Sequence, residues 1–272
     1  MALQAAQVVM TNVQTEWVNR ADHGADEQNS GLVCECDVLS LNHCVLTSRP
    51  DGGRSRALEW KARTGTGSVI TITDCVFTGT GYGLWFHQPP GRCSLQNALF
   101  ETQRAAMRCD LSEPGAQDIT LRLRQLTVPG GISLLDAVVL NDQVGDVRVQ
   151  LECSESVLLP TLGLVQFASS GHWPVSRAAV EFQLPERGNP AIVSPGMRPA
   201  VAWDSQLQHV VALNENQVRT DALLYAAPVF ADPAAIEPSG ESTSLYRRYQ
   251  LIDYEGPKLN QQMPGIDSSR LP

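Results

Sequence analysis

The sequence predicts an all-β fold: a right-handed parallel β-helix with three strands per turn, followed by an irregular C-terminal tail. A strand–corner–strand motif recurs along the chain, shorter alternating segments lie between its copies, and polar residues stand at the expected corners. The 272 residues are enough for one large hydrophobic core, and the repeats favour a single elongated domain. We therefore expect a β-helix repeat domain over residues 1–225 and a proline-rich tail or cap over residues 226–272.

The motif is clearest in residues 68–79, where apolar residues are spaced by two, three and two positions: Ile70, Ile72, Cys75 and Phe77. Two strands with alternating side chains give this spacing if they meet at a sharp bend. Further copies occupy residues 8–15, 39–46, 93–100, 121–128 and, more weakly, 211–218. Each turn of a solenoid buries its inward side chains on its neighbours, so equivalent positions should stack. The predicted internal column is Leu41, Ile72, Leu95 and Leu123.

The segments between motif copies also alternate, and we interpret them as the third strand of each turn: residues 58–60, 84–86, 107–109, 134–138, 162–167, 201–203 and 223–225. The bend of each motif should fall on the polar residue before its third apolar position. These corner residues are Asn12, His43, Asp74, Asn97 and Gln125. Asn and Asp tolerate the left-handed backbone of a sharp bend, and stacked copies can hydrogen-bond to one another. For His43 and Gln125 an ordinary polar turn is the alternative.

Residues 39–46, 70–77 and 93–100 resemble right-handed parallel β-helix repeat proteins, the pectate-lyase-like superfamily. The resemblance covers residues 8–225 and implies the fold. It implies no single activity, because that superfamily includes lyases, hydrolases, adhesins and many non-catalytic repeat regions. Such repeats are also similar to regions of large bacterial surface or signalling proteins.

Charge and the N-terminus limit the partners and the compartment. A net charge of −9 and a pI near 5.0 disfavour binding to nucleic acid or to an anionic membrane. No apolar run is long enough to insert in a membrane, and no signal peptide is evident, so the chain as written looks cytoplasmic. It would be extracytoplasmic as a piece of a longer exported chain. Only seven residues precede the first motif, which predicts that an upstream domain or a partner caps the first turn.

The seven cysteines are expected to be small core residues, because several occupy apolar positions of the motif. Cys44 and Cys75 hold the same position in consecutive copies, and a disulfide between them is the alternative. Cys34 and Cys36 have no second pair at zinc spacing. We expect no metal and no cofactor. His23, His172 and His209 have no partner at a spacing that indicates a metal or a nucleophile, and we assign them no role.

Alternation in the third strands predicts an exposed group of outward residues, which we call the surface column: Glu59, Trp85, His87, Arg108, Asp110 and, as an extension, Asp136. An exposed Trp beside carboxylates and Arg is what a sugar-binding groove requires. The resemblance implies lyases with a calcium-binding acidic cluster and a basic residue, or hydrolases with clustered Asp; this sequence has no Asp-Asp pair and no Gly-His-Gly. Arg108, Asp110 and Asp136 are the candidate catalytic residues, with the last two as a possible carboxylate pair. The alternative is a solvated sheet face with Trp85 half covered by residues 87–91.

Three functions follow from these patterns. The leading hypothesis is a non-catalytic repeat module, a scaffold or recognition surface for a polysaccharide or a protein within a larger assembly. The second is a polysaccharide lyase or glycoside hydrolase that acts on an acidic polysaccharide. The third is a purely structural segment of a bacterial multidomain surface or signalling protein, in which the surface column has no role.

Overall fold

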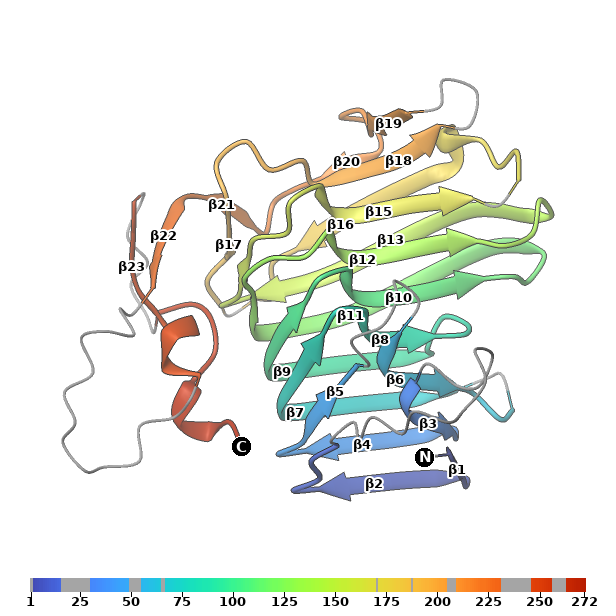
Figure 1. The fold of residues 1–272 in the computed structure, drawn as a ribbon. Helices are drawn as coiled ribbons and strands as arrows, with labels where there is room; N and C mark the ends of the chain where they lie inside the picture. Colours follow the sequence, from blue (N-terminus) through green and yellow to red (C-terminus); the bar gives the residue numbers. More distant parts are fainter. Residues whose placement is uncertain are drawn as a thin grey trace, which may run out of the picture.

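The computed structural model describes residues 2–15, 30–48, 55–64, 67–169, 171–186, 188–204, 209–230, 246–255 and 263–272. Within these ranges the chain forms parallel strands stacked into a β-solenoid, so the predicted all-β, parallel fold is confirmed (Figure 1). The helices within these ranges are three short 3-10 helices: η1 (Val175–Arg177), η3 (Arg247–Tyr249) and η4 (Ser268–Arg270). None of the described helices is long and apolar enough to cross a membrane. His23 lies outside the described residues.

The first sheet collects the predicted third strands. Its order is β1 (Ala2–Gln4), β3 (Ser30–Glu35), β6 (Arg56–Lys61), β8 (Tyr82–Phe86), β10 (Ala105–Leu111), β12 (Ser133–Val139), β15 (Gly163–Ser169), β18 (Ala200–Asp204) and β19 (His209–Ala212). All neighbours are parallel except β18 and β19, which pair antiparallel. The prediction of a weak motif copy at 211–218 is therefore wrong, because β19 runs antiparallel to β18 in the first sheet and does not begin another turn of the solenoid.

The second sheet carries the motif copies. Its main order is β2 (Gln7–Thr11), β4 (Val38–Asn42), β7 (Val69–Gly79), β9 (Arg92–Thr102), β11 (Gly115–Val128), β13 (Val144–Ser154), β16 (Ala178–Gln183) and β20 (Val218–Arg219). Four short strands continue it beyond the corners: β5 (Val45–Thr47), β14 (Val157–Leu158), β17 (Ala191–Val193) and β21 (Leu223–Tyr225). Residues 223–225 were predicted as a third strand; instead β21 pairs with β17 in this sheet.

The interior consists of like side chains stacked in register. Leu41, Ile72, Leu95 and Leu123 pair in succession and are buried, so the predicted internal column is confirmed. Met10 and Cys153 extend this column at its two ends. Burial of one such side chain contributes about 1.5–3 kcal/mol relative to exposure, and no turn can obtain this without its neighbours.

The corners adopt the left-handed backbone that the sequence predicted. Asn12, His43, Asp74, Asn97 and Gln125 have φ values of 57°, 54°, 52°, 50° and 54°. The alternative of ordinary turns at His43 and Gln125 is thus wrong. Stacked corner side chains also bond to each other, since Asn97 Nδ2 donates to Asp74 Oδ1 over 2.7 Å.

Glu155 is a further corner residue that the sequence did not reveal, with a φ of 51°. It belongs to a motif copy over residues 151–158 in which Ser156 takes the place of the third apolar residue. The Ser156 hydroxyl donates to the carbonyl of Ser154 and accepts from the amide of Leu126, so this polar group is satisfied although it is buried.

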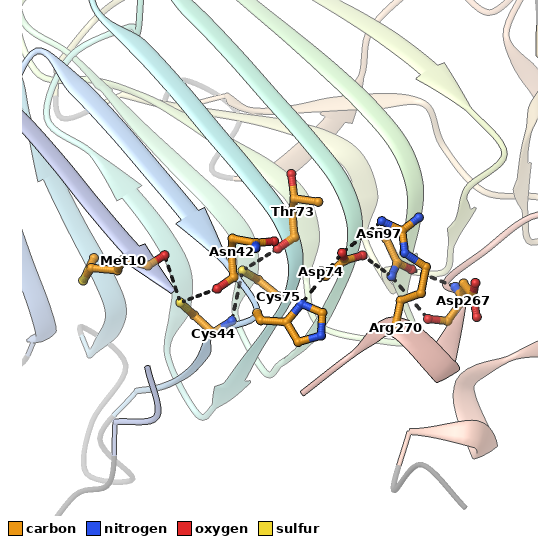
Figure 2. A network of polar contacts seen from close by, with 10 residues as sticks. Met10, Asn42, Cys44, Thr73, Asp74, Cys75, Asn97, Asp267 and Arg270 are labelled. Atoms are coloured by element: carbon orange, nitrogen blue, oxygen red, sulfur yellow. Dashed lines mark hydrogen bonds and ion pairs between the residues drawn. The ribbon is translucent and has the colours of Figure 1, made fainter. Parts of the chain in front are cut away.

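All seven cysteines are free and buried, as expected for core residues. Cys44 and Cys75 stack at one corner, where the amide of Cys44 donates to Cys75 Sγ over 3.4 Å (Figure 2). Cys44 Sγ faces the carbonyl of Asn42, and Cys75 Sγ faces that of Thr73. The hydrogen bond with Cys44 and burial together raise the pKa of the Cys75 thiol.

The C-terminal part packs along the flank of the solenoid (Figure 1). β22 (Ala227–Phe230) and β23 (Leu251–Glu255) form an antiparallel pair. Leu251 and Tyr254 of β23 are buried against Val157 and Ile192. Further along the chain, Ile266 and Leu271 are buried against turns near the N-terminal end, as described below.

Candidate functional site

Parallel register on the first sheet places four residues of the surface column in one line. Glu59 on β6 pairs with Trp85 on β8, which pairs with Arg108 on β10, which pairs with Asp136 on β12. Asp110 lies on the same face of β10 as Arg108, because alternate residues of a strand share a face. His87 directly follows β8. The structure therefore brings together all six residues that the alternation selected.

Trp85 is not the exposed platform that the sequence predicted. It is only 8% exposed. The guanidinium carbons of Arg108 and Arg56 lie 3.8 Å and 4.5 Å from its ring centroid, and Tyr82 packs edge-on against it at 5.4 Å. Cation–π contacts of this kind stabilise the closed arrangement and leave little ring surface for a sugar. Arg56, which the sequence analysis did not select, stands at the start of β6.

Two carboxylates of the surface column, Glu59 and Asp110, are held by neighbouring side chains. Glu59 Oε2 pairs with Arg56 Nη2, and Glu59 Oε1 lies beside His87 Nε2, both over 2.5 Å. Asp110 Oδ1 accepts from Arg108 Nε over 2.7 Å, and Asp110 Oδ2 accepts from Trp85 Nε1 over 2.9 Å. Both oxygens of Asp110 are therefore engaged, and the carboxylate is 4% exposed. A group held in this way is poorly placed to act as a free base or nucleophile.

Burial raises the pKa of Asp136, the last residue of the surface column. Its carboxyl accepts a hydrogen bond from the Ser133 hydroxyl and is 9% exposed. Hydrogen bonds from Ser133 and Tyr82 and the charge of Arg108 oppose the rise in pKa. Asp136 thus holds a proton more readily than an ordinary aspartic acid.

The remaining histidines contribute nothing to the surface column. His172 is exposed, and its amide donates to Asp142 Oδ1; His209 lies on the edge strand β19. Across the described ranges, no group of three His, Cys, Asp or Glu side chains is arranged to hold a metal ion.

A second surface lies on the strand segments that follow the corners of the second sheet. Side chains on the outer face of a solenoid are usually polar, but here most of the outward residues are apolar. Consecutive register pairs align its members, which we call the outer apolar column: Val45, Val76, Leu99, Thr127, Val157, Ile192 and Leu224. The C-terminal residues cover it, and Figure 2 shows Asp267 and Arg270 beside the corner residues Asp74 and Asn97. The sequence signal for this surface was an apolar residue directly after the inward residue at Cys44, Cys75 and Ala98.

A cavity of about 520 Å³ adjoins the outer apolar column near the ends of β7 and β9. Its lining includes Thr78, Glu101, Thr102, Pro129 and, from the C-terminal part, Tyr249. The Tyr249 hydroxyl donates to the Glu101 carboxylate. Burial and this carboxylate raise the pKa of Tyr249 to about 12.

The chain matches no protein-family model, no curated protein and no solved structure. The resemblance to the pectate-lyase-like superfamily therefore has no support from sequence comparison. The parallel β-solenoid is the part of that expectation that the structure supports.

Proposed function

We propose that this chain is a non-catalytic β-solenoid module that serves as a scaffold or recognition surface within a larger assembly. The closure of the surface column supports this most directly. Asp110 is bound at both oxygens, and Glu59 is shared by Arg56 and His87. Catalytic groups need access to a substrate in addition to a suitable pKa, and these groups are occupied by one another.

Incubation of the purified chain with polygalacturonate and other uronans tests the proposal. We expect neither unsaturated products nor new reducing ends over many hours. Release of either product, abolished by Arg108→Ala or Asp110→Ala, would contradict the non-catalytic assignment and support a lyase or hydrolase.

The enzyme remains the second candidate because of Asp136, whose raised pKa suits a general acid. Its partner would have to be Asp110, after release from Arg108 and Trp85. Asp136→Asn is the informative variant, because it keeps the volume and removes the proton donor. Loss of a measurable activity in this variant would favour the enzyme.

The recognition surface would take either a protein or a carbohydrate. A carbohydrate at the surface column would need to displace a guanidinium group from the Trp85 ring. Glycan-array binding by the wild-type chain that disappears in Trp85→Ala would support this ligand. Binding that appears only in Arg56→Ala would show that the native surface is closed to sugars.

A further inference from the structure

The outer apolar column needs to be covered, because a contiguous apolar patch on the surface of a protein promotes association or aggregation when it is exposed. Val76 and Leu99 have no exposed surface in the folded chain. Ile266 and Leu271, which are 3% and 7% exposed, cover them together with the partly buried Tyr246 and Tyr249. The Ile266 and Leu271 side chains anchor residues 263–272, which we call the C-terminal segment.

The C-terminal segment crosses successive turns and bonds to one after another. The amide of Gly265 donates to the carbonyl of Glu155, and the amide of Ile266 donates to Thr127 Oγ1 over 3.1 Å. One turn further, the amide of Asp267 donates to Asn97 Oδ1 over 2.7 Å. The segment therefore runs along the solenoid axis, perpendicular to the strands that it crosses and parallel to the hydrogen bonds between turns.

The far end of the C-terminal segment is fixed by charge. Arg270 Nη2 lies 2.9 Å from Asp74 Oδ2 (Figure 2). The same carboxylate oxygen is 3.8 Å from His43 Nδ1. The Asp74 side chain is 7% exposed, whereas that of Arg270 is 44% exposed. The Asp74 carboxylate is thus a buried part of the solenoid wall, and the Arg270 guanidinium contacts it from the solvent side.

These contacts define the chemistry of a ligand. The wall offers acceptors at Glu155, Thr127, Asn97 and Asp74, so the ligand must supply backbone amides and a cation. It must also supply two aliphatic side chains for Val76 and Leu99. Asp267 begins a short turn, in which its side chain accepts a hydrogen bond from the amide of Ser269. This turn places the Arg270 guanidinium beside Asp74. A peptide of the form Ile-Asp-x-x-Arg-Leu, with a 3-10 turn after its Asp, meets all these requirements.

We propose that the outer apolar column between Val45 and Val157 is a peptide-binding site, and that the C-terminal segment is its intramolecular ligand. Its partner is another polypeptide with an Ile-Asp-x-x-Arg-Leu segment, which binds when the chain's own segment leaves. This inference rests on the proposed recognition function and names its surface and partner.

The way in which the C-terminal segment is held makes exchange feasible. β23 is anchored by its pairing with β22, but no residue of 263–272 belongs to a strand. Within the part of the chain that the structure describes, only the bond from Gly265 joins the segment to a backbone carbonyl of the wall. Tethering raises the effective concentration of the segment at the site, so the intramolecular ligand competes strongly with a free peptide of the same sequence.

The test is binding of a fluorescein-labelled synthetic peptide of residues 263–272, measured by fluorescence anisotropy. The full-length wild-type chain should bind it weakly. The full-length Ile266→Ala/Leu271→Ala variant, with a weakened intramolecular ligand and an intact wall, should bind it at least tenfold more tightly, as expected for removal of a tethered competitor. A labelled peptide carrying Arg270→Ala should lose most of that gain. Ile252→Ala is the matched control, because Ile252 on β23 is 56% exposed; this variant should bind like wild type.

Equal peptide binding by the double variant and by wild type would overturn the proposal, as would equal binding of the Arg270→Ala peptide. If the double variant does not fold, hydrogen exchange on the wild-type chain decides: amides of 265–267 should exchange much faster than those of β9, and equal protection would count against an exchangeable segment. Dimers dissolved by excess peptide would support the same site with a second copy as its occupant. Turnover of a uronan would end the non-catalytic assignment without affecting these results.

Discussion

Replacing Asn97 by Ala should destabilise the chain more than most single changes on its flank. Asn97 has no exposed surface and a φ of 50°. Its side chain donates to Asp74 Oδ1 and to the carbonyl of Asp267, and it accepts from the amide of Asp267. Loss of three hydrogen bonds costs about 3 kcal/mol, at about 1 kcal/mol each. A left-handed alanine adds about 1 kcal/mol.

Asn97→Gly separates these two contributions, because glycine loses the same hydrogen bonds without the strain. We expect unfolding free energies lower by about 4 kcal/mol for Asn97→Ala and about 3 kcal/mol for Asn97→Gly. Urea titrations followed by circular dichroism measure both. A loss below about 1 kcal/mol in Asn97→Ala would refute the reasoning, because it would mean that the corner neither strains a side chain nor depends on these bonds.

Three further predictions concern the core, the buried acid and the thiols. Ile72→Ala removes side-chain volume from the middle of the internal column and should cost about 2–5 kcal/mol in the same titrations, whereas Thr71→Ala on the outer face should cost under about 0.5 kcal/mol. Because burial raises the folded-state pKa of Asp136, its contribution to stability is complete below pH 3.8 and decreases as the pH rises through the folded pKa. The wild-type chain should therefore lose stability relative to Asp136→Asn between pH 4 and pH 7, and an unchanged difference would contradict the assignment. Thiol titration with Ellman's reagent should find no reactive cysteine in the native chain and all seven in denaturant, because every cysteine is buried. Burial raises the pKa of Cys153 to about 12, whereas the hydrogen bond with Cys75 lowers the pKa of Cys44 to about 6, so for Cys44 the protection rests on its lack of exposed surface. Rapid native labelling would contradict this.

The repeating core could be predicted from the sequence because each turn repeats the same spacing of apolar residues. Leu41, Ile72, Leu95 and Leu123 stand at one position of one motif, and stacking is the only way for such short turns to bury them. Irregular turns were not predictable in the same way. The copy containing Glu155 was hidden by Ser156, whose polar side chain is tolerated by bonds to backbone groups of its own turn and of β11.

The residues of the surface column could be predicted from the sequence, but the contacts that cover the Trp85 ring could not. Alternation on each strand selected Trp85 and Arg108, but the closure of the ring depends on Arg56, on the neighbouring strand β6. The outer apolar column was missed for a related reason. Val76 and Leu99 are 23 residues apart and face outward, so only the C-terminal segment, far away in sequence, explains why they are apolar.

A double-mutant cycle on Arg108 and Asp110 tests most directly whether the surface column is satisfied by its own residues. Their side chains are 18% and 6% exposed, and Arg108 also lies over Trp85. Unfolding free energies of wild type, Arg108→Ala, Asp110→Ala and the double variant should give a coupling energy of about 1–3 kcal/mol. A coupling energy below about 0.3 kcal/mol, with both single variants as stable as wild type, would contradict this account. It would mean that Arg108 and Asp110 do not stabilise each other and are available to a ligand or substrate.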